Sequence, residues 1–200
     1  MIKYSCRTQT NRRIDMITIR PYQEKDKEDV RFICLNSEGP SQDSARINNF
    51  VLKTYCDYFI EQEGRNCFVA VDENDKAIAY VICAENYDNY YKCFLKEYVP
   101  RLKYDIILRM RAIHSSIPQR KFKAEYPAHL HIDVLPEYHR MGIGHKLVDT
   151  LCAHLKAKGI KGVMLTTGVD NEKGNGFYKK YGFTQLEVTK GDVAYGLKLL

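Results

Sequence analysis

The first half of the chain alternates short apolar runs with stretches whose apolar residues recur at helical spacing. Residues 16–21, 67–71 and 76–84 have the composition and length of strands. The turn sequence between the last two predicts that they pair as a hairpin. Helices are expected at 26–36 and at 44–62, where apolar side chains follow a helical period: Ile47, Phe50, Val51, Tyr55, Tyr58 and Phe59.

Residues 85–126 separate this hairpin from the next strand and are expected to form a helical insert. One helix is predicted from 87 until Pro100 ends it, and a second at 106–114. The insert could line a ligand pocket or simply pack on the sheet through its aromatic stripe: Tyr87, Tyr91, Phe94, Leu95 and Tyr98.

The second half alternates strands and helices more regularly. Strands are expected at 128–135, 163–167, 184–189 and 193–199, and helices at 143–158 and 171–180. The complete order predicts an α/β (α+β) fold with a mixed, mostly antiparallel central sheet of about seven strands flanked by helices. Residues 1–15 lack periodicity and are expected to be an N-terminal extension, with one domain over 16–200.

Composition narrows the class of protein. Hydrophobic residues make up 44% and charged residues 28%, as in soluble globular proteins, and the longest apolar run is too short to span a bilayer. The net charge of +6 suits a polyanionic small ligand, but the basic residues follow no nucleic-acid motif. Seven cysteines without a C-x-x-C motif argue against a disulfide framework and favour a cytoplasmic protein. No nucleic-acid or membrane partner is therefore expected.

The stretch 134–148 is the most informative part of the chain. A strand ends at a proline, a turn containing Gly142 and Gly144 follows, and an amphipathic helix begins. Free backbone N–H groups and the helix dipole then point at one spot, which makes an anion site. A ligand that carries phosphate is the first hypothesis.

Two motifs together resemble the GNAT N-acetyltransferase superfamily. The first is Glu137-Tyr-His-Arg-Met-Gly-Ile-Gly144, and the second is Asn171-Glu-Lys-Gly-Asn-Gly-Phe-Tyr-Lys-Lys-Tyr-Gly-Phe183. The family signatures are Gln/Arg-x-x-Gly-x-Gly/Ala and Asn-x-x-Ala-x-x-Phe-Tyr-x-x-x-Gly-Phe. This chain departs from them at His139, where Gln or Arg is usual, and at Gly174, where Ala is usual.

The resemblance implies acetyl-CoA as the acyl donor. It places the pyrophosphate on the turn at 139–145 and pairs the pantetheine arm with the end of the preceding strand. The Leu135 N–H would stabilise the oxyanion, Asn171 would bind the arm, and Tyr178 would lie near the sulfur. The implied cofactor-binding residues are Val134, Leu135, His139, Arg140, Met141, Gly142, Ile143, Gly144, His145, Asn171 and Tyr178.

Acyl transfer to an amine needs a base for the amine proton and an acid for the leaving thiolate. Tyr178 is the candidate acid, although a tyrosine at this spacing could serve packing alone. His129, His131 and Asp133 alternate along one strand and therefore share a face. Asp133 and His131 are the preferred catalytic candidates, with Glu85 as a further base. A metal site on this face is the less favoured alternative, and no metal is expected.

The sequence thus predicts transfer of an acetyl group from acetyl-CoA to a primary amine of an unidentified acceptor. Neither motif contains a cysteine, so transfer is expected to be direct, in a ternary complex. A non-catalytic acyl-CoA binding or sensing domain is the alternative from another class. The acceptor is expected to be a small-molecule or peptide amine, and the protein a monomer or homodimer.

Overall fold

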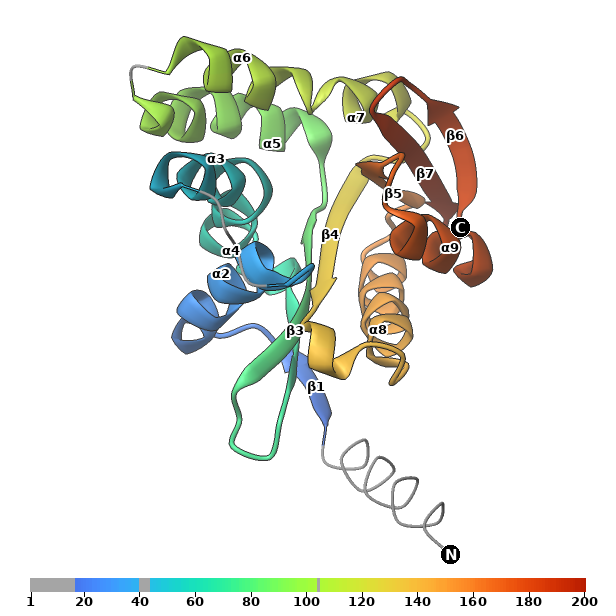
Figure 1. The fold of residues 1–200 in the computed structure, drawn as a ribbon. Coiled ribbons are helices and arrows are strands. Elements are labelled where there is room, and N and C mark those ends of the chain that lie inside the picture. The colour runs from blue at the N-terminus through green and yellow to red at the C-terminus, as the bar shows by residue number, and fades with distance from the viewer. Residues whose placement is uncertain (1–16, 40–43, 104) are drawn as a thin grey trace, which may run out of the picture.

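The computed structural model describes residues 17–39, 44–103 and 105–200. Its centre is a seven-stranded sheet in the order β1-β2-β3-β4-β5-β7-β6 (Figure 1). Neighbouring strands are antiparallel except β4 and β5. The predicted mixed, mostly antiparallel sheet is confirmed. The strands are Thr18–Pro21 (β1), Phe68–Val71 (β2), Ala77–Ala84 (β3), Ala128–Val134 (β4), Gly162–Gly168 (β5), Thr184–Val188 (β6) and Asp192–Lys198 (β7). The expected extension at 1–15 lies outside the described residues.

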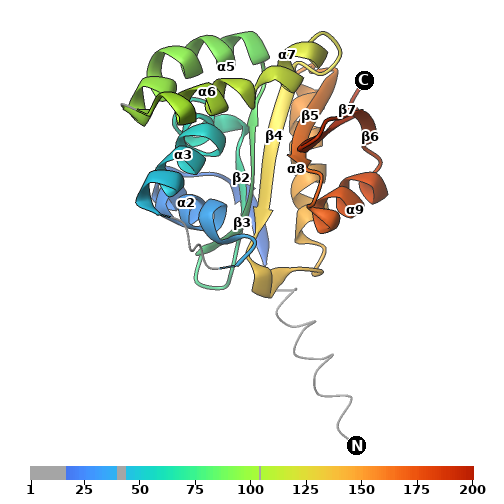
Figure 2. The ribbon, with the colours of Figure 1, turned by 45° about the horizontal axis from the view of Figure 1, so that its top comes forward.

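Helices cover both faces of the sheet, as Figure 2 shows. One face carries α2 (Lys27–Asn36), α3 (Ala45–Tyr55), α4 (Asp57–Gln62), α5 (Tyr87–Cys93), α6 (Ile106–His114) and α7 (Ile117–Phe122). The other carries α8 (Ile143–Ala157) and α9 (Glu172–Tyr181). No helix of the described residues is long and apolar enough to cross a membrane.

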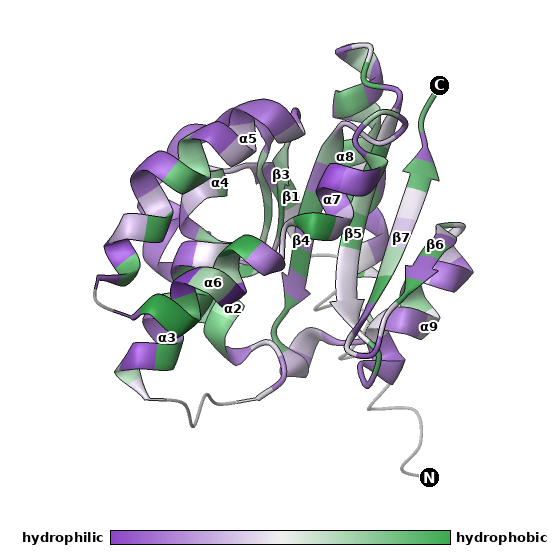
Figure 3. Ribbon diagram, turned by 90° about the horizontal axis from the view of Figure 1, so that it is seen from above, coloured by the Kyte–Doolittle hydropathy of each residue, from purple (hydrophilic) through white to green (hydrophobic). Residues whose placement is uncertain are grey.

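The two faces divide the core, because the side chains of a strand alternate between them. All eight residues of β3 are buried, which places this strand at the centre of both layers. In β4, Leu130, Ile132 and Val134 pack toward α8. The hydropathy colouring of Figure 3 alternates along β4 and passes from hydrophobic to near-neutral along β5. The alternating faces of β4 are therefore those that the sequence predicts.

Several helix boundaries differ from the predictions. The helix expected at 44–62 breaks at Cys56, which has φ −131° and ψ −63°, into α3 and α4. The break lets four consecutive residues, 57–60, all be buried, which one face of a continuous helix does not allow. After α5 the chain makes a π-helical turn at Phe94–Tyr98 before Pro100. The helix α7 lacks a clear apolar period and was not predicted.

The parallel pair β4–β5 is much shorter than its neighbours. Only Ala128↔Val163 and His129↔Met164 are paired, whereas β3 and β4 pair at six positions. The two strands begin side by side and lie apart toward their carboxyl ends (Figure 2). The outer part of β4 therefore faces a gap in the middle of the sheet.

Candidate active site

The exposed backbone edge of β4 follows from its register with β3. The N–H of Leu135 donates to the carbonyl of Ile78 at 3.0 Å, which makes these two residues a hydrogen-bonded pair. Because such pairs alternate along an antiparallel ladder, Asp133 also points its backbone groups at β3, whereas those of Ile132 and Val134 point into the gap. The Leu135 N–H was expected to stabilise an oxyanion. That expectation is wrong, since this group is already bonded inside the sheet.

His139 returns from the turn to the end of β4. Its Nε2 donates to the carbonyl of Val134 at 2.9 Å, although the side chain is otherwise exposed. The Val134 carbonyl has no hydrogen-bond partner on β5, and His139 of the turn supplies the donor instead. His139 was predicted to bind the pyrophosphate. In the structure its ring instead donates to the backbone of β4, where the acyl end of the cofactor was expected.

The turn before α8 leaves the start of that helix open. Gly142 is the N-cap with φ +77°, and no side-chain hydrogen bond caps the helix. Arg140 also has a positive φ, +62°. Ile143 is buried and Met141 packs against the same apolar cluster, so apolar contacts hold the turn while the first N–H groups of the helix have no partner within it. Such a cradle, at the N-terminus of a 15-residue helix, fits a pyrophosphate group.

Gly142 and Gly176 offer a matched pair of substitutions, since neither has atoms within 4 Å of an added Cβ. Gly142→Ala should destabilise the protein by about 1–2 kcal/mol, because its positive φ is costly for an L-residue. Gly176→Ala, inside α9, should instead stabilise it by up to about 1 kcal/mol through helix propensity. Urea denaturation of both variants checks this, and equal signs would contradict the assigned backbone conformations.

Asn171 and Gly174 act together at the start of α9. The Oδ1 of Asn171 accepts from the N–H of Gly174 at 2.8 Å, and its Nδ2 donates to Thr167 at 3.1 Å. A Cβ on Gly174 would lie 2.7 Å from that Nδ2. Glycine in place of the usual alanine is therefore explained by the folded-back side chain of Asn171. The predicted arm-binding residue serves here as a helix cap.

Tyr178 lies on the buried side of α9. It is 8% exposed, and its ring centroid lies 5.6 Å from that of Tyr195. Burial, and then the negative charge of Asp133, raise the pKa of Tyr178 above its ordinary range. The phenol therefore keeps its proton at neutral pH, and it lies within electrostatic reach of Asp133. Asp133 and Tyr178 belong to different elements, β4 and α9, and the charge of one acts on the other.

The three polar side chains of β4 share one face, as predicted, but aromatic rings cover that face. The His131 ring lies 5.0 Å from Phe59 and 5.5 Å from Tyr55. Burial lowers the pKa of His131 to about 4. It lowers the pKa of His129 to about 3, and the Nδ1 of His129 has no hydrogen-bond partner among the described residues. Both rings are neutral at neutral pH.

Of the three polar side chains on this face, Asp133 is the one whose pKa suits a general base near neutral pH. Burial raises its pKa to about 6, although hydrogen bonds from Tyr80 and Ser37 lower it. The Tyr80 hydroxyl donates to Oδ2 of Asp133, and Tyr80 itself is fully buried. Tyr80 was missed in the sequence. Its position opposite Asp133 in the hairpin strand could have been found only from the β3–β4 register.

Glu85, the further candidate base, lies in a different network. Its carboxylate pairs with Lys158, and it also accepts from Arg65 and Asn66, each at 3.1 Å. Burial raises the pKa of Glu85, but these donors lower it below its usual range. A carboxylate held by two cations is a poor base, so the structure favours Asp133 over Glu85.

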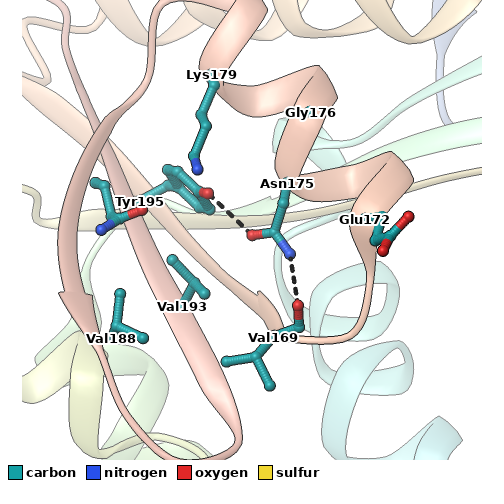
Figure 4. A pocket seen from close by; sticks show the side chains of 9 residues that line it. Val169, Glu172, Asn175, Gly176, Lys179, Val188, Val193 and Tyr195 are labelled. Carbon is teal, nitrogen blue, oxygen red and sulfur yellow. Dashed lines mark hydrogen bonds between the residues drawn. The ribbon is translucent and has the colours of Figure 1, made fainter.

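A shallow groove of about 500 Å³ lies between α9 and the β6–β7 hairpin (Figure 4). The Oδ1 of Asn175 accepts from the Tyr195 hydroxyl at 2.9 Å across its floor. No predicted catalytic or cofactor-binding residue is among those that line this groove. The other residues that line it are Val169, Glu172, Gly176, Lys179, Gln185, Val188 and Val193.

Comparisons with known proteins agree with this geometry. Residues 28–183 match the Acetyltransferase (GNAT) family. N-alpha-acetyltransferase 30 of Schizosaccharomyces pombe is 26% identical over 169 residues, which cover 84% of each chain. Over a shorter stretch of 60 residues, this chain is 38% identical to the uncharacterized N-acetyltransferase MJ1207 of Methanocaldococcus jannaschii. That stretch spans 30% of this chain and 26% of that relative.

Solved structures share the fold. The crystal structure of SsHAT superposes with a TM-score of 0.80 at 24% identity, covering 92% of this chain and 98% of that one. The PaiA N-acetyltransferase of Thermoplasma acidophilum in complex with coenzyme A gives a TM-score of 0.58 at 17% identity, over 91% and 98% of the two chains. The predictions of an acetyltransferase fold, an N-acetyltransferase activity and acetyl-CoA as donor are confirmed. The chain belongs to the GNAT family of acetyltransferases.

Proposed function

We propose that this enzyme acetylates a primary amine of a small molecule or peptide by direct transfer, at the gap between β4 and β5. The observation that carries the proposal is the short β4–β5 pairing, which leaves the end of β4, with Asp133, unpaired on that side. Asp133 has a raised pKa, and its charge acts on Tyr178 of α9, whose phenol keeps its proton. The unpaired edge of β4 and the open start of α8 supply the two kinds of backbone donor and acceptor that acetyl-CoA requires.

The residues that would hold acetyl-CoA fall into two groups. The turn from His139 to His145 would bind the pyrophosphate through N–H groups of Met141, Gly142, Ile143, Gly144 and their neighbours, with Arg140 adding charge. The backbone of Ile132 would pair with the pantetheine arm, because its groups face the gap, whereas the carbonyl of Val134 is already bonded to His139. Asn171 would reach the arm only if its side chain left the cap on Gly174.

Bound acetyl-CoA supplies an activated acetyl group whose carbonyl carbon accepts the amine and whose thiolate departs. Asp133 would accept the proton that the amine must lose, directly or through a water. His131, with its low pKa and aromatic neighbours, would shape the wall beside the amine rather than take its proton. Tyr178 would donate its proton to the sulfur, and the Val134 N–H would replace that of Leu135 as the oxyanion donor.

A cytoplasmic location and a monomer or homodimer complete the proposal. The described cysteines are all free thiols, which suits a reducing compartment. Direct transfer is supported by the absence of cysteine from 129–145 and 171–183, since a covalent acetyl-enzyme needs a nucleophile there. The names of the relatives support amines as acceptors, and that of the Schizosaccharomyces pombe protein supports α-amines in particular.

Thiol release from acetyl-CoA, measured with a panel of small amines and peptides, tests this function. We expect release that depends on the amine and is accompanied by an equal amount of acetylated product. Tight binding of coenzyme A, shown by calorimetry, without turnover on any amine would instead identify a non-catalytic sensing domain.

A further inference from the structure

The outward face of α6 is unusually apolar for a surface helix. Ile106, Ile107 and Met110 are 64%, 69% and 65% exposed, and they lie on one side of the helix with Arg111 and His114. The opposite side, with Leu108 and Ala112, is buried against the core. We call Ile106, Ile107, Met110, Arg111 and His114 the α6 face. Exposed apolar groups gathered in this way are typical of interaction surfaces rather than of plain solvated helices.

The charge of this face is positive. Asp105, which precedes the helix, is the acidic residue of the described segment 105–117, and its carboxylate is held by Arg46 and by the N–H of Leu108. Arg111 forms no ion pair within the part of the chain that the structure describes. A partner that covers this face must therefore bring apolar side chains and negative charge. A second copy of the same face would bring positive charge and be repelled.

The α6 face is connected to the proposed active site by a row of side chains. The Arg111 guanidinium lies 5.4 Å from the centre of the Phe50 ring. Phe50 contacts Tyr55 with ring centroids 6.1 Å apart, and Tyr55 contacts His131 at 5.5 Å. His131 lies two residues before Asp133 on the same face of β4, so these contacts link Arg111 of the α6 face to the strand that carries the proposed base.

We propose that the α6 face docks an acidic polypeptide with interspersed apolar residues, and that this polypeptide carries the amine that is acetylated. The inference rests on the proposed function and narrows its acceptor from any amine to a polypeptide. A small amine has no use for apolar contacts on this helix, whereas a peptide that runs from Asp133 past His131 and Tyr55 reaches them. Membrane lipid offers negative charge too, and binding to vesicles distinguishes it from a polypeptide.

The test uses Ile107→Glu, with Leu200→Glu as the matched control, because these side chains are 69% and 72% exposed and neither supports the core. Two peptides share one N-terminal residue and alternate Leu with either Glu or Arg thereafter, so that each carries one primary amine. We expect the wild-type kcat/KM to be about tenfold higher for the acidic peptide at low salt. Ile107→Glu should lower that value about tenfold through KM. Leu200→Glu should not change it, and neither variant should alter turnover of a small amine.

Binding of the fluorescein-labelled acidic peptide, followed by anisotropy, provides a readout that does not need catalysis. Loss of binding in Ile107→Glu alone supports the docking surface even if no acceptor is acetylated, which would refute only the proposed function. Equal kinetics for both peptides, together with unchanged peptide binding in Ile107→Glu, would overturn the inference. So would binding to phosphatidylserine vesicles that Ile107→Glu abolishes while peptide binding persists, since the face would then serve a membrane.

Discussion

Asp133→Asn should lower kcat for amine acetylation by about 10²–10⁴-fold, the usual effect of removing a general base. The amide has the shape of the carboxylate and still accepts a hydrogen bond from Tyr80, but it takes no proton. Because burial raises the pKa of Asp133 to about 6, the wild-type kcat/KM should fall as the pH drops through that value. Initial rates between pH 5 and pH 9 measure both effects, and circular dichroism checks that the variant folds.

Tyr80→Phe keeps the Asp133 carboxylate and removes one hydrogen bond to it, so it tests how Tyr80 sets the pKa of Asp133. The hydrogen bond from Tyr80 lowers the pKa of Asp133, so its removal should move the acidic limb of the pH profile upward while leaving substantial activity at high pH. An unchanged acidic limb in Tyr80→Phe, or full activity in Asp133→Asn, would show that another group takes the proton.

Tyr178→Phe should lower kcat by about 10²-fold or more, since the variant lacks the proton that we assign to the departing sulfur. The phenyl ring keeps the contacts with Phe183 and Tyr195, so stability and coenzyme A affinity should change little. Tyr181→Phe is the matched control on the same helix, because its hydroxyl donates to Asp149 at 2.6 Å away from the gap. The kcat values and coenzyme A affinities of both variants test this prediction. An equal loss of kcat in Tyr178→Phe and Tyr181→Phe would mean that Tyr178 has only a packing role.

Much of the fold was predictable because strand alternation and helical spacing are local properties of the chain. The strand order was not, since the pairing of β7 between β5 and β6 depends on contacts among distant residues. The break at Cys56 also depends on tertiary packing, because burying 57–60 on all sides outweighs the helical pattern that runs through it.

The site shows the same division. The spacing of His129, His131 and Asp133 correctly predicted a shared face, but the aromatic rings that cover it come from α3, α4 and α5. The resemblance placed Leu135 at the oxyanion, whereas only the register with Ile78 reveals that its N–H is already bonded. The contact between His139 and the Val134 carbonyl was likewise invisible, because a motif does not state the direction in which a side chain turns.

A crystal structure of the enzyme with coenzyme A tests the central claim most directly. We expect the pantetheine arm to pair with Ile132, and the sulfur to lie about 3–4 Å from the Tyr178 hydroxyl, on the side of the gap that faces Asp133. An arm that lies instead in the groove between α9 and the β6–β7 hairpin, or a sulfur remote from both side chains, would contradict the account.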